Sequence, residues 1–150
     1  MSMKIESNAF QYGSEIPRKH GYKKDNINPP LIVQDVPTNA KSLALIMDDP
    51  DAMEAVGKVW VHWVVWNIDP NTSEIKENSI PSNSIQGKTD FGEIAYGGPA
   101  PPDKEHTYVF KLYALDDKLS LDEGSTKSQL EEAMGNHVIA ESKLEGKYAP

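Results

Sequence analysis

Three segments of the chain carry apolar residues in patterns that predict β-strands. Residues 42–47 form a short, nearly continuous apolar run that ends at the acidic stretch 48–51, as a buried strand followed by a turn would. Residues 60–68 are rich in Val and Trp on both alternating faces, which predicts burial on both sides. Residues 106–115 place apolar side chains on one face and Lys111 on the other, so one face is expected to contact water. Short segments of this kind favour antiparallel pairing.

A stripe of apolar positions near the carboxyl end predicts a helix. The spacing i, i+3, i+4, i+7 and i+8 is that of Leu130, Ala133, Met134, His137 and Val138. Thr126 and Gln129 have the spacing of a capping box, so the helix is expected over residues 125–134. Gly135 interrupts the pattern, but the stripe continues and a further helical segment is expected beyond it, with His137 as a structural residue.

Composition and charge restrict the class of protein. A chain of 150 residues without repeats, punctuated by 11 Pro and 10 Gly, predicts one mainly β domain spanning residues 1–150. The absence of Cys excludes disulfides, thiolate metal centres and a catalytic thiol. The net charge of −8 makes a nucleic-acid partner unexpected. No apolar stretch has the length of a signal peptide or a membrane span, so a cytoplasmic protein is expected.

The acidic stretch at residues 48–51 is the first candidate for chemistry. If the chain is extended through Pro50, the side chains of Asp49 and Asp51 leave on the same side. Two carboxylates placed in this way suit general acid–base catalysis or a hard cation. A solvated turn is the competing interpretation, because Asp and Pro are common turn residues.

The histidines are the second group of candidates. His62 lies within an apolar strand, where it is either a ligand contact or a hydrogen-bonded core residue. His106 shares a strand face with Tyr108, so the two form one pocket, unless Tyr108 is a core residue and His106 lies at the surface. His20, in the basic segment 18–24, is expected to be solvated. Because no two histidines are closely spaced, neither a metal site nor a cofactor is expected.

Several segments share their order and spacing with a known protein family. They are Asn28-Pro29-Pro30-Leu31, residues 41–45 leading into Asp49-Pro50-Asp51-Ala52, residues 60–68, residues 96–102 followed by His106-Thr107-Tyr108, and residues 136–141 and 144–148. Together they resemble the phosphatidylethanolamine-binding protein family, over nearly the whole chain. The two carboxyl-terminal segments resemble its small bacterial and archaeal branch, often described as Raf-kinase-inhibitor-like.

The resemblance implies a fold and a binding site. The fold would have a large central antiparallel sheet, a smaller sheet and short peripheral helices toward the carboxyl end. The site would be a small pocket for phosphate, phosphorylated headgroups or similar oxyanions, lined by Asp49, Asp51, His62, the backbone of Gly98 and Pro99, His106 and Tyr108. No catalytic residue, metal or cofactor is implied. The resemblance further implies a regulatory or inhibitory role toward a partner such as a kinase or protease, and a homodimer is compatible with it.

Four positions depart from the pattern of that family. Met53 replaces a Pro, Thr107 an Arg that follows the His, Lys104 a Gly and Val33 a Trp. Arg18 is the only arginine of the chain, so a bidentate guanidinium clamp on phosphate is scarcely available. These departures affect the identity of the ligand more than the fold.

The electrostatics of such a pocket favour particular ligands. Carboxylates beside an imidazole favour its charged form, so His62 or His106 is expected to present cationic N–H donors. The backbone N–H groups around Gly98 would add further donors. Because the carboxylates repel a dianion, an amine-bearing group, a monoanion or a phosphate that shares a proton with an Asp fits better than bare phosphate.

Two other classes of function are open. A hydrolase or lyase would use Asp49, Asp51 and His62 as acid–base groups, with or without a divalent metal. An interaction domain would inhibit a kinase or protease through its surface loops. Metal content together with a turnover screen distinguishes the first class from a binding protein, and a pull-down from host lysate distinguishes the second.

Overall fold

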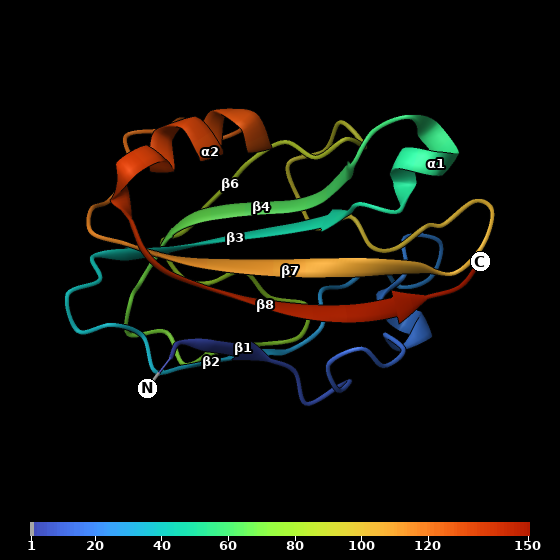
Figure 1. The fold of residues 1–150 in the computed structure, drawn as a ribbon, viewed down its shortest axis with the longest axis horizontal. Coiled ribbons are helices and arrows are strands. Elements are labelled where there is room, and N and C mark those ends of the chain that lie inside the picture. Colours follow the sequence, from blue (N-terminus) through green and yellow to red (C-terminus); the bar gives the residue numbers. More distant parts are fainter. Residues whose placement is uncertain (1) are drawn as a thin grey trace.

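Two antiparallel sheets make up most of the chain. The computed structural model describes residues 2–150. The larger sheet has the strand order β6-β4-β3-β7-β8 and the smaller one the order β1-β2-β5 (Figure 1). The strands are β1 (Lys4–Glu6), β2 (Leu31–Gln34), β3 (Ser42–Asp49), β4 (Trp60–Ile68), β5 (Glu74–Ile75), β6 (Ile85–Gln86), β7 (His106–Leu115) and β8 (Val138–Tyr148). The predicted mainly β fold with a large and a small antiparallel sheet is therefore confirmed.

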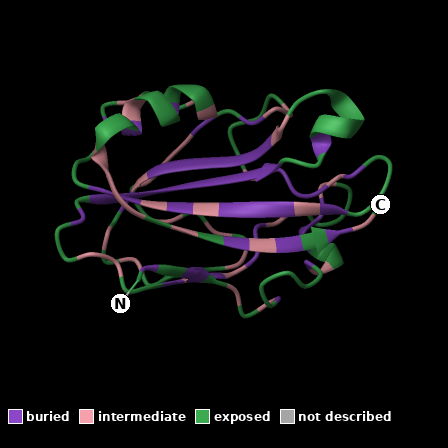
Figure 2. Ribbon diagram, viewed as in Figure 1, coloured by how far each residue is buried: buried purple, intermediate pink, exposed green. Residues whose placement is uncertain are grey.

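The central strands of the larger sheet separate two apolar clusters. Every residue of β3 is buried, and β4 is buried on both faces, as predicted (Figure 2). One face, which includes Leu45 and Phe110, packs against the smaller sheet. The other face, which includes Ile46 and Trp66, packs against the helix near the carboxyl end. Because side chains alternate along a strand, neighbouring residues of β3 reach opposite clusters. In β7, Lys111 is partly exposed, as expected.

The helices are short and lie at the periphery. Helix α2 (Lys127–Met134) begins after Thr126, whose side chain forms the predicted capping box with Gln129, and it covers one face of the larger sheet (Figure 1). Helix α1 (Ala52–Val56) follows β3 directly and was not predicted. Two 3₁₀ turns, Arg18–His20 and Gly135–His137, complete the helical structure of residues 2–150. None of the helices in this range is long and apolar enough to cross a membrane.

The carboxyl-terminal segment corrects one expectation. The further helical segment predicted after Gly135 is wrong, because the chain makes a single 3₁₀ turn and then forms β8. Strand β8 pairs with β7 from Tyr148 opposite His106 to Val138 opposite Leu115. His137 lies outside the apolar stripe, with its side chain 44% exposed and its Nδ1 2.7 Å from Asp116 Oδ1. Residues 138–148 are extended because they pair with β7 along its whole length.

The outer edge of β8 is covered along its carboxyl-terminal half. Gly13 N donates to Glu145 O at 2.8 Å, and Ile16 N donates to Lys147 O at 2.7 Å. Lys147 N donates in return to Ser14 O at 2.9 Å. Residues 13–16 therefore cover the last residues of the edge strand, from Glu145 onward, and join the amino-terminal segment to the larger sheet.

Candidate functional site

A small cavity opens where β3 and β4 meet helix α1. Its volume is about 210 Å³, and it is lined by Asp49, Ala52, Ala55, Val56, Trp60, His62, Phe91, Ala100 and Pro102. The walls are largely apolar, and the titratable groups of the lining are Asp49 at the end of β3 and His62 in β4. A pocket with apolar walls and a few polar groups at one place is the usual form of a small-ligand site.

Asp49 is held by a charged pair beneath the cavity. Its Oδ2 lies 2.6 Å from His106 Nδ1, and His106 Nε2 lies 2.7 Å from Asp103 Oδ1. Burial by itself lowers the pKa of His106, but the hydrogen bonds to Asp49 and Asp103 outweigh it, and the pKa is raised. The imidazolium donates from both nitrogens, so no ring N–H of His106 is free for a ligand.

His62 is a hydrogen-bond acceptor toward the cavity. Its Nδ1–H donates to the carbonyl oxygen of Gly97 at 2.7 Å, and Gly97 N donates back to His62 O at 2.8 Å. Burial lowers the pKa of His62, despite the raising effect of the backbone of Gly97 and Gly98 and of the charge of Asp49. A neutral ring with its proton on Nδ1 leaves Nε2 as an acceptor. Of the two histidines named as possible cationic donors, His106 has the raised pKa and His62 the lowered one.

Two buried oxygen atoms near the cavity lack a hydrogen-bond partner within residues 2–150. They are Oδ1 of Asp49 and the hydroxyl of Tyr108. Burial raises the pKa of Tyr108, and the charge of Asp49 raises it further, so the phenol keeps its proton. The ring of Tyr108 meets the ring of His62 edge to face, with centroids 5.1 Å apart. Unpartnered buried polar atoms are costly, and a bound ligand is one way to satisfy them.

Phe91 forms an aromatic wall that the sequence did not reveal. Its ring stacks on Tyr22 at a centroid distance of 4.0 Å and meets Trp60 and His62 edge to face. A Cβ at Gly97 would collide with this ring, so Gly allows the wall to lie against the segment that holds His62. Because a single Phe in a loop belongs to no periodic pattern, nothing in the sequence could have marked it.

The segment that contains Gly98 and Pro99 packs against another loop. Gly98 N donates to Asn26 Oδ1 at 2.8 Å, and Tyr22 N donates to Pro99 O at 2.9 Å. A Cβ at Gly98 would collide with the carbonyl oxygen of His20. Neither Gly98 nor Pro99 lines the cavity, and the N–H of Gly98 is already used. The glycine is required here for close backbone packing.

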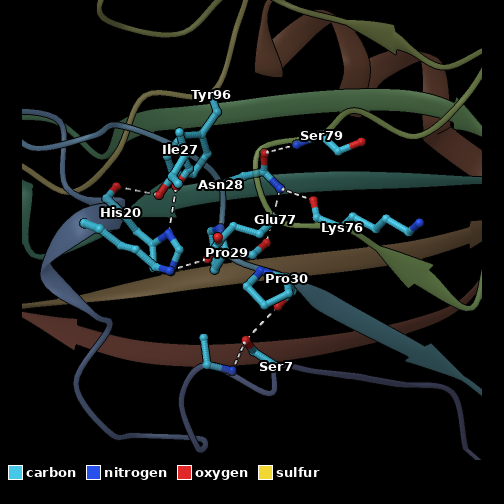
Figure 3. Close-up of polar contacts among 12 residues, drawn as sticks. Ser7, His20, Ile27, Asn28, Pro29, Pro30, Lys76, Glu77, Ser79 and Tyr96 are labelled. Carbon is cyan, nitrogen blue, oxygen red and sulfur yellow. Dashed lines mark hydrogen bonds and ion pairs between the residues drawn. The ribbon is translucent and has the colours of Figure 1, made fainter.

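A buried polar network supports that loop (Figure 3). His20 is fully buried, which contradicts the solvated loop expected for it, and its Nδ1 donates to Ile27 O at 2.8 Å. Tyr96 donates its hydroxyl proton to His20 O at 2.9 Å. The amide of Asn28 donates to Lys76 O at 3.0 Å and accepts from Ser79 N at 2.9 Å. These bonds fix residues 20–28 against the Gly97 segment and so position His62.

Comparison with known proteins places this geometry in a family. The family model described as phosphatidylethanolamine-binding protein matches residues 6–149. The chain belongs to the phosphatidylethanolamine-binding protein family. A UPF0098 protein of Methanothermobacter thermautotrophicus is 45% identical, with 97% of this chain and 98% of the relative covered. A UPF0098 protein of Chlamydia trachomatis is 46% identical over the same shares of the two chains.

Two solved structures of this family share the fold. The homologue CT736 of Chlamydia trachomatis, described as a putative phosphatidylethanolamine-binding protein homologue, superposes with a TM-score of 0.92 at 45% identity, covering 98% of this chain and 97% of that one. YbcL of E. coli, described as a new member of the mammalian family, has a TM-score of 0.90 at 29% identity, covering 99% and 98%. The resemblance noted in the sequence is confirmed.

The structure gathers only part of the set of site residues that the family resemblance implied. Asp49 and His62 line the cavity, and Tyr108 is buried behind them. Asp51 lies outside it, because the backbone turns into α1 at this residue instead of staying extended, and its Oδ2 accepts from Thr107 N at 2.8 Å. The expected convergence of Asp49 and Asp51 on one side is therefore not found. Within residues 2–150, no group of three or more His, Cys, Asp or Glu side chains is arranged to hold a metal ion.

The residues that depart from the family pattern have identifiable contacts. Met53 lies in α1 beside the cavity and is 55% exposed. Lys104 Nζ pairs with Glu54 Oε2 at 2.8 Å, which joins the loop before β7 to α1. Thr107 contributes its backbone N–H to Asp51, and Val33 is buried in the smaller sheet. None of the four residues lines the cavity.

The two site histidines are expected to titrate in opposite directions. NMR titration of the ring nitrogens should place the pKa of His106 above about 6.5 and that of His62 below it. The contribution of His106 to stability is therefore present below about pH 6.5 and is lost as pH rises through its folded pKa. The contribution of His62 is present above about pH 6.5 and is lost as pH falls. A His62 that titrates above His106 would contradict the hydrogen-bond assignment.

Proposed function

We propose that the protein is a binding protein for a small phosphorylated ligand, such as phosphate or a phosphorylated headgroup, held in the cavity at Asp49 and His62. One observation carries the proposal: two buried oxygen atoms, Asp49 Oδ1 and the Tyr108 hydroxyl, have no partner within residues 2–150. Asp49 and His62 line an apolar cavity of about 210 Å³, and Tyr108 is buried behind them. A ligand that supplies hydrogen bonds to the two oxygen atoms would remove the cost of leaving them unpaired.

His62 is the residue whose loss should most directly reduce binding. Because His62 is neutral and offers Nε2 as an acceptor for a P–O–H proton, a hydrogen bond of about 0.5–1.5 kcal/mol is lost, and His62→Ala should weaken binding of inorganic phosphate and phosphoethanolamine by roughly two- to tenfold. Isothermal titration calorimetry measures this change. The matched control is His137→Ala, at a half-exposed histidine bonded to Asp116, which should leave the affinity unchanged.

The competing reading of His62 makes a different prediction for the same variant. If His62 is only a core residue, His62→Ala lowers the melting temperature strongly and leaves phosphate affinity unchanged. A variant that binds phosphate as tightly as the parent would therefore contradict the proposal, whatever its stability.

The wider functional expectations stay predictions. A regulatory or inhibitory role toward a kinase or protease is tested by pull-down from host lysate with the intact protein. Native mass spectrometry of freshly purified protein reports a homodimer, a retained ligand and a bound metal together. The cytoplasmic location is tested by fractionation. The acid–base alternative needs Asp49, Asp51 and His62 together, and Asp51 lies outside the cavity that the other two line.

A further inference from the structure

A second cavity, of about 270 Å³, shares no lining residue with the cavity at Asp49. Part of its wall belongs to the buried network of Figure 3, through Ile27, Asn28, Ser79 and Tyr96. We infer that this second cavity binds an uncharged ligand that presents carbonyl oxygens. The inference is independent of the proposed function. It follows from the hydrogen bonds that the lining side chains make within the protein and from the groups that these bonds leave open.

The second cavity is polar but carries no charge. Among the described residues that line it there is no Asp, Glu, Lys, Arg or His, although 25% of the residues of the chain are Asp, Glu, Lys or Arg. Burial raises the pKa of Tyr96, whose hydroxyl donates to His20 O at 2.9 Å, so the phenol keeps its proton. Glu77, next to the lining residue Asn78, has its Oε1 2.8 Å from Lys19 Nζ. An ion in the cavity would lose hydration without meeting an opposite charge, so an uncharged ligand is favoured.

Two carboxamides that line the second cavity are held in one orientation. Gln86 Oε1 accepts from the indole N–H of Trp63 at 2.7 Å, and Asn26 Oδ1 accepts from Gly98 N at 2.8 Å. An indole N–H and a backbone N–H can only donate, so each amide must turn its oxygen toward that donor and its NH₂ group away from it. Neither NH₂ group donates to another group within residues 2–150. The second cavity therefore offers N–H donors whose direction is set by the fold.

The remaining polar side chains of the wall are either used or adaptable. Both protons of the Asn28 amide are taken by backbone carbonyls, and its oxygen accepts from Ser79 N at 2.9 Å, so this amide holds the wall together. The side chains of Asn78 and Ser79 can donate or accept as a ligand requires. The requirement that the wall imposes on a ligand thus comes from the two fixed NH₂ groups. A carbonyl oxygen satisfies it, because a carbonyl oxygen can only accept.

The apolar part of the wall suits the body of such a ligand. The rings of Trp63 and Tyr96 meet edge to face with centroids 5.4 Å apart, and both are fixed by the hydrogen bonds given above. Ile80 is 52% exposed, so a ligand that covers it removes apolar surface from water. Groups that are already held in place lose little freedom on binding, which favours affinity. The volume has room for about one amino acid residue with blocked ends.

The test uses N-acetyl-L-proline dimethylamide, an uncharged probe with two carbonyl oxygens and no N–H of its own. It is titrated into the intact, isotope-labelled protein near neutral pH, and NMR follows the side-chain N–H signals of Gln86, Asn26 and Trp63. We expect the three signals to shift along one saturable curve, with a Kd on the order of 1 mM for a ligand of this size. N-acetyl-L-proline, which carries a carboxylate in place of the dimethylamide, should bind at least about fivefold more weakly.

An isosteric variant removes one donor and keeps the contact that fixes it. In Gln86→Glu the carboxylate still accepts from Trp63, but it turns an oxygen toward the ligand, so affinity for the probe should fall at least about tenfold. The matched control is Gln129→Glu in the exposed capping box, which adds the same charge where Glu is equally suited and should leave the affinity unchanged. If Gln86→Glu fails to fold, Asn26→Asp makes the same exchange at Gly98 N and should have the same effect.

The same carbonyl groups occur in peptide chains and in small molecules, and a longer probe distinguishes the two sources. If N-acetyl-Ala-Pro-Ala-amide binds at least about threefold more tightly than the blocked proline, the second cavity is assigned to a peptide. Equal or weaker binding assigns it to a free small molecule.

The remaining outcomes overturn the inference and leave phosphate binding at Asp49 untouched. They are the absence of a saturable shift up to about 50 mM probe, N-acetyl-L-proline binding as tightly as the uncharged probe, and an unchanged affinity in folded Gln86→Glu. Methyl glucopyranoside that binds where the blocked proline does not would also overturn it, because hydroxyl groups can donate as well as accept. The second cavity would then belong to a sugar.

Discussion

Replacing His106 with alanine is expected to lower the free energy of unfolding by about 3–5 kcal/mol. His106 is fully buried and bridges Asp49 and Asp103 with bonds of 2.6 and 2.7 Å. Without the imidazolium, both oxygens of the buried Asp49 carboxylate lack a partner, since Oδ1 has none already. Urea denaturation followed by circular dichroism at pH 6 measures the loss, because the pKa of His106 is raised and its ring is charged there.

The second carboxylate on the same imidazole provides the control. Asp103 is 41% exposed, against 4% for Asp49, so its charge remains solvated when it is unpaired. Asp103→Ala should therefore cost much less than His106→Ala. Equal losses from the two variants would mean that the bond to the exposed Asp103, and not the pairing with the buried Asp49, accounts for the contribution of His106.

Replacing Phe110 with alanine is expected to cost about 3–5 kcal/mol of unfolding free energy. Phe110 is fully buried in β7, opposite Met47 in β3 and Leu144 in β8, and its ring centroid lies 6.1 Å from that of Phe10. Neighbours held by two sheets can move little into the space left behind, so most of the cavity should persist. Chemical denaturation measures the change, with phosphate affinity as a second readout.

A surface position on the neighbouring strand is the control for Phe110. Lys143 has 61% of its side chain exposed, so Lys143→Thr should alter stability far less and should leave ligand binding alone. Phe110→Ala should also leave the binding site intact under conditions where the variant is folded, because Phe110 does not line the cavity. A loss of stability no larger than that of Lys143→Thr would show that the two sheets can close the gap.

The central strands were predictable because their own residues favour that conformation. Residues 60–68 and 106–115 have β-branched and aromatic side chains with a period of two, and both form strands over those bounds. The capping box gave the start of α2 for the same local reason. Strand β8 was missed because its first residue, Val138, continues the spacing of α2, while the conformation of the strand depends on pairing with β7. Strands β1 and β5 are too short for any period to show.

Which residues belong to the site could be predicted better than how their side chains are arranged and protonated. The positions of Asp49 and His62 at one cavity were expected from the family resemblance, while their local sequence left a solvated turn and a core histidine as alternatives. The neutral state of His62 was not, because it depends on a carbonyl group 35 residues away. The burial of His20 likewise depends on Ile27, Tyr96 and the network around Asn28. Such contacts are set by tertiary structure and leave no local pattern.

The covered half of β8 also bears on self-association. An edge strand of eleven residues offers free N–H and C=O groups to which a strand of another molecule can add, the usual route to aggregation. Residues 13–16 occupy these groups from Glu145 onward. Earlier in the strand, Glu141 and Lys143 are exposed and charged, and inserting either charge between two stacked edges would be unfavourable. Residues 13–16 thus protect this part of the edge of β8. Truncating the amino-terminal segment would expose N–H and C=O groups to which strands of other molecules can add, and fibrillar assembly would follow that route.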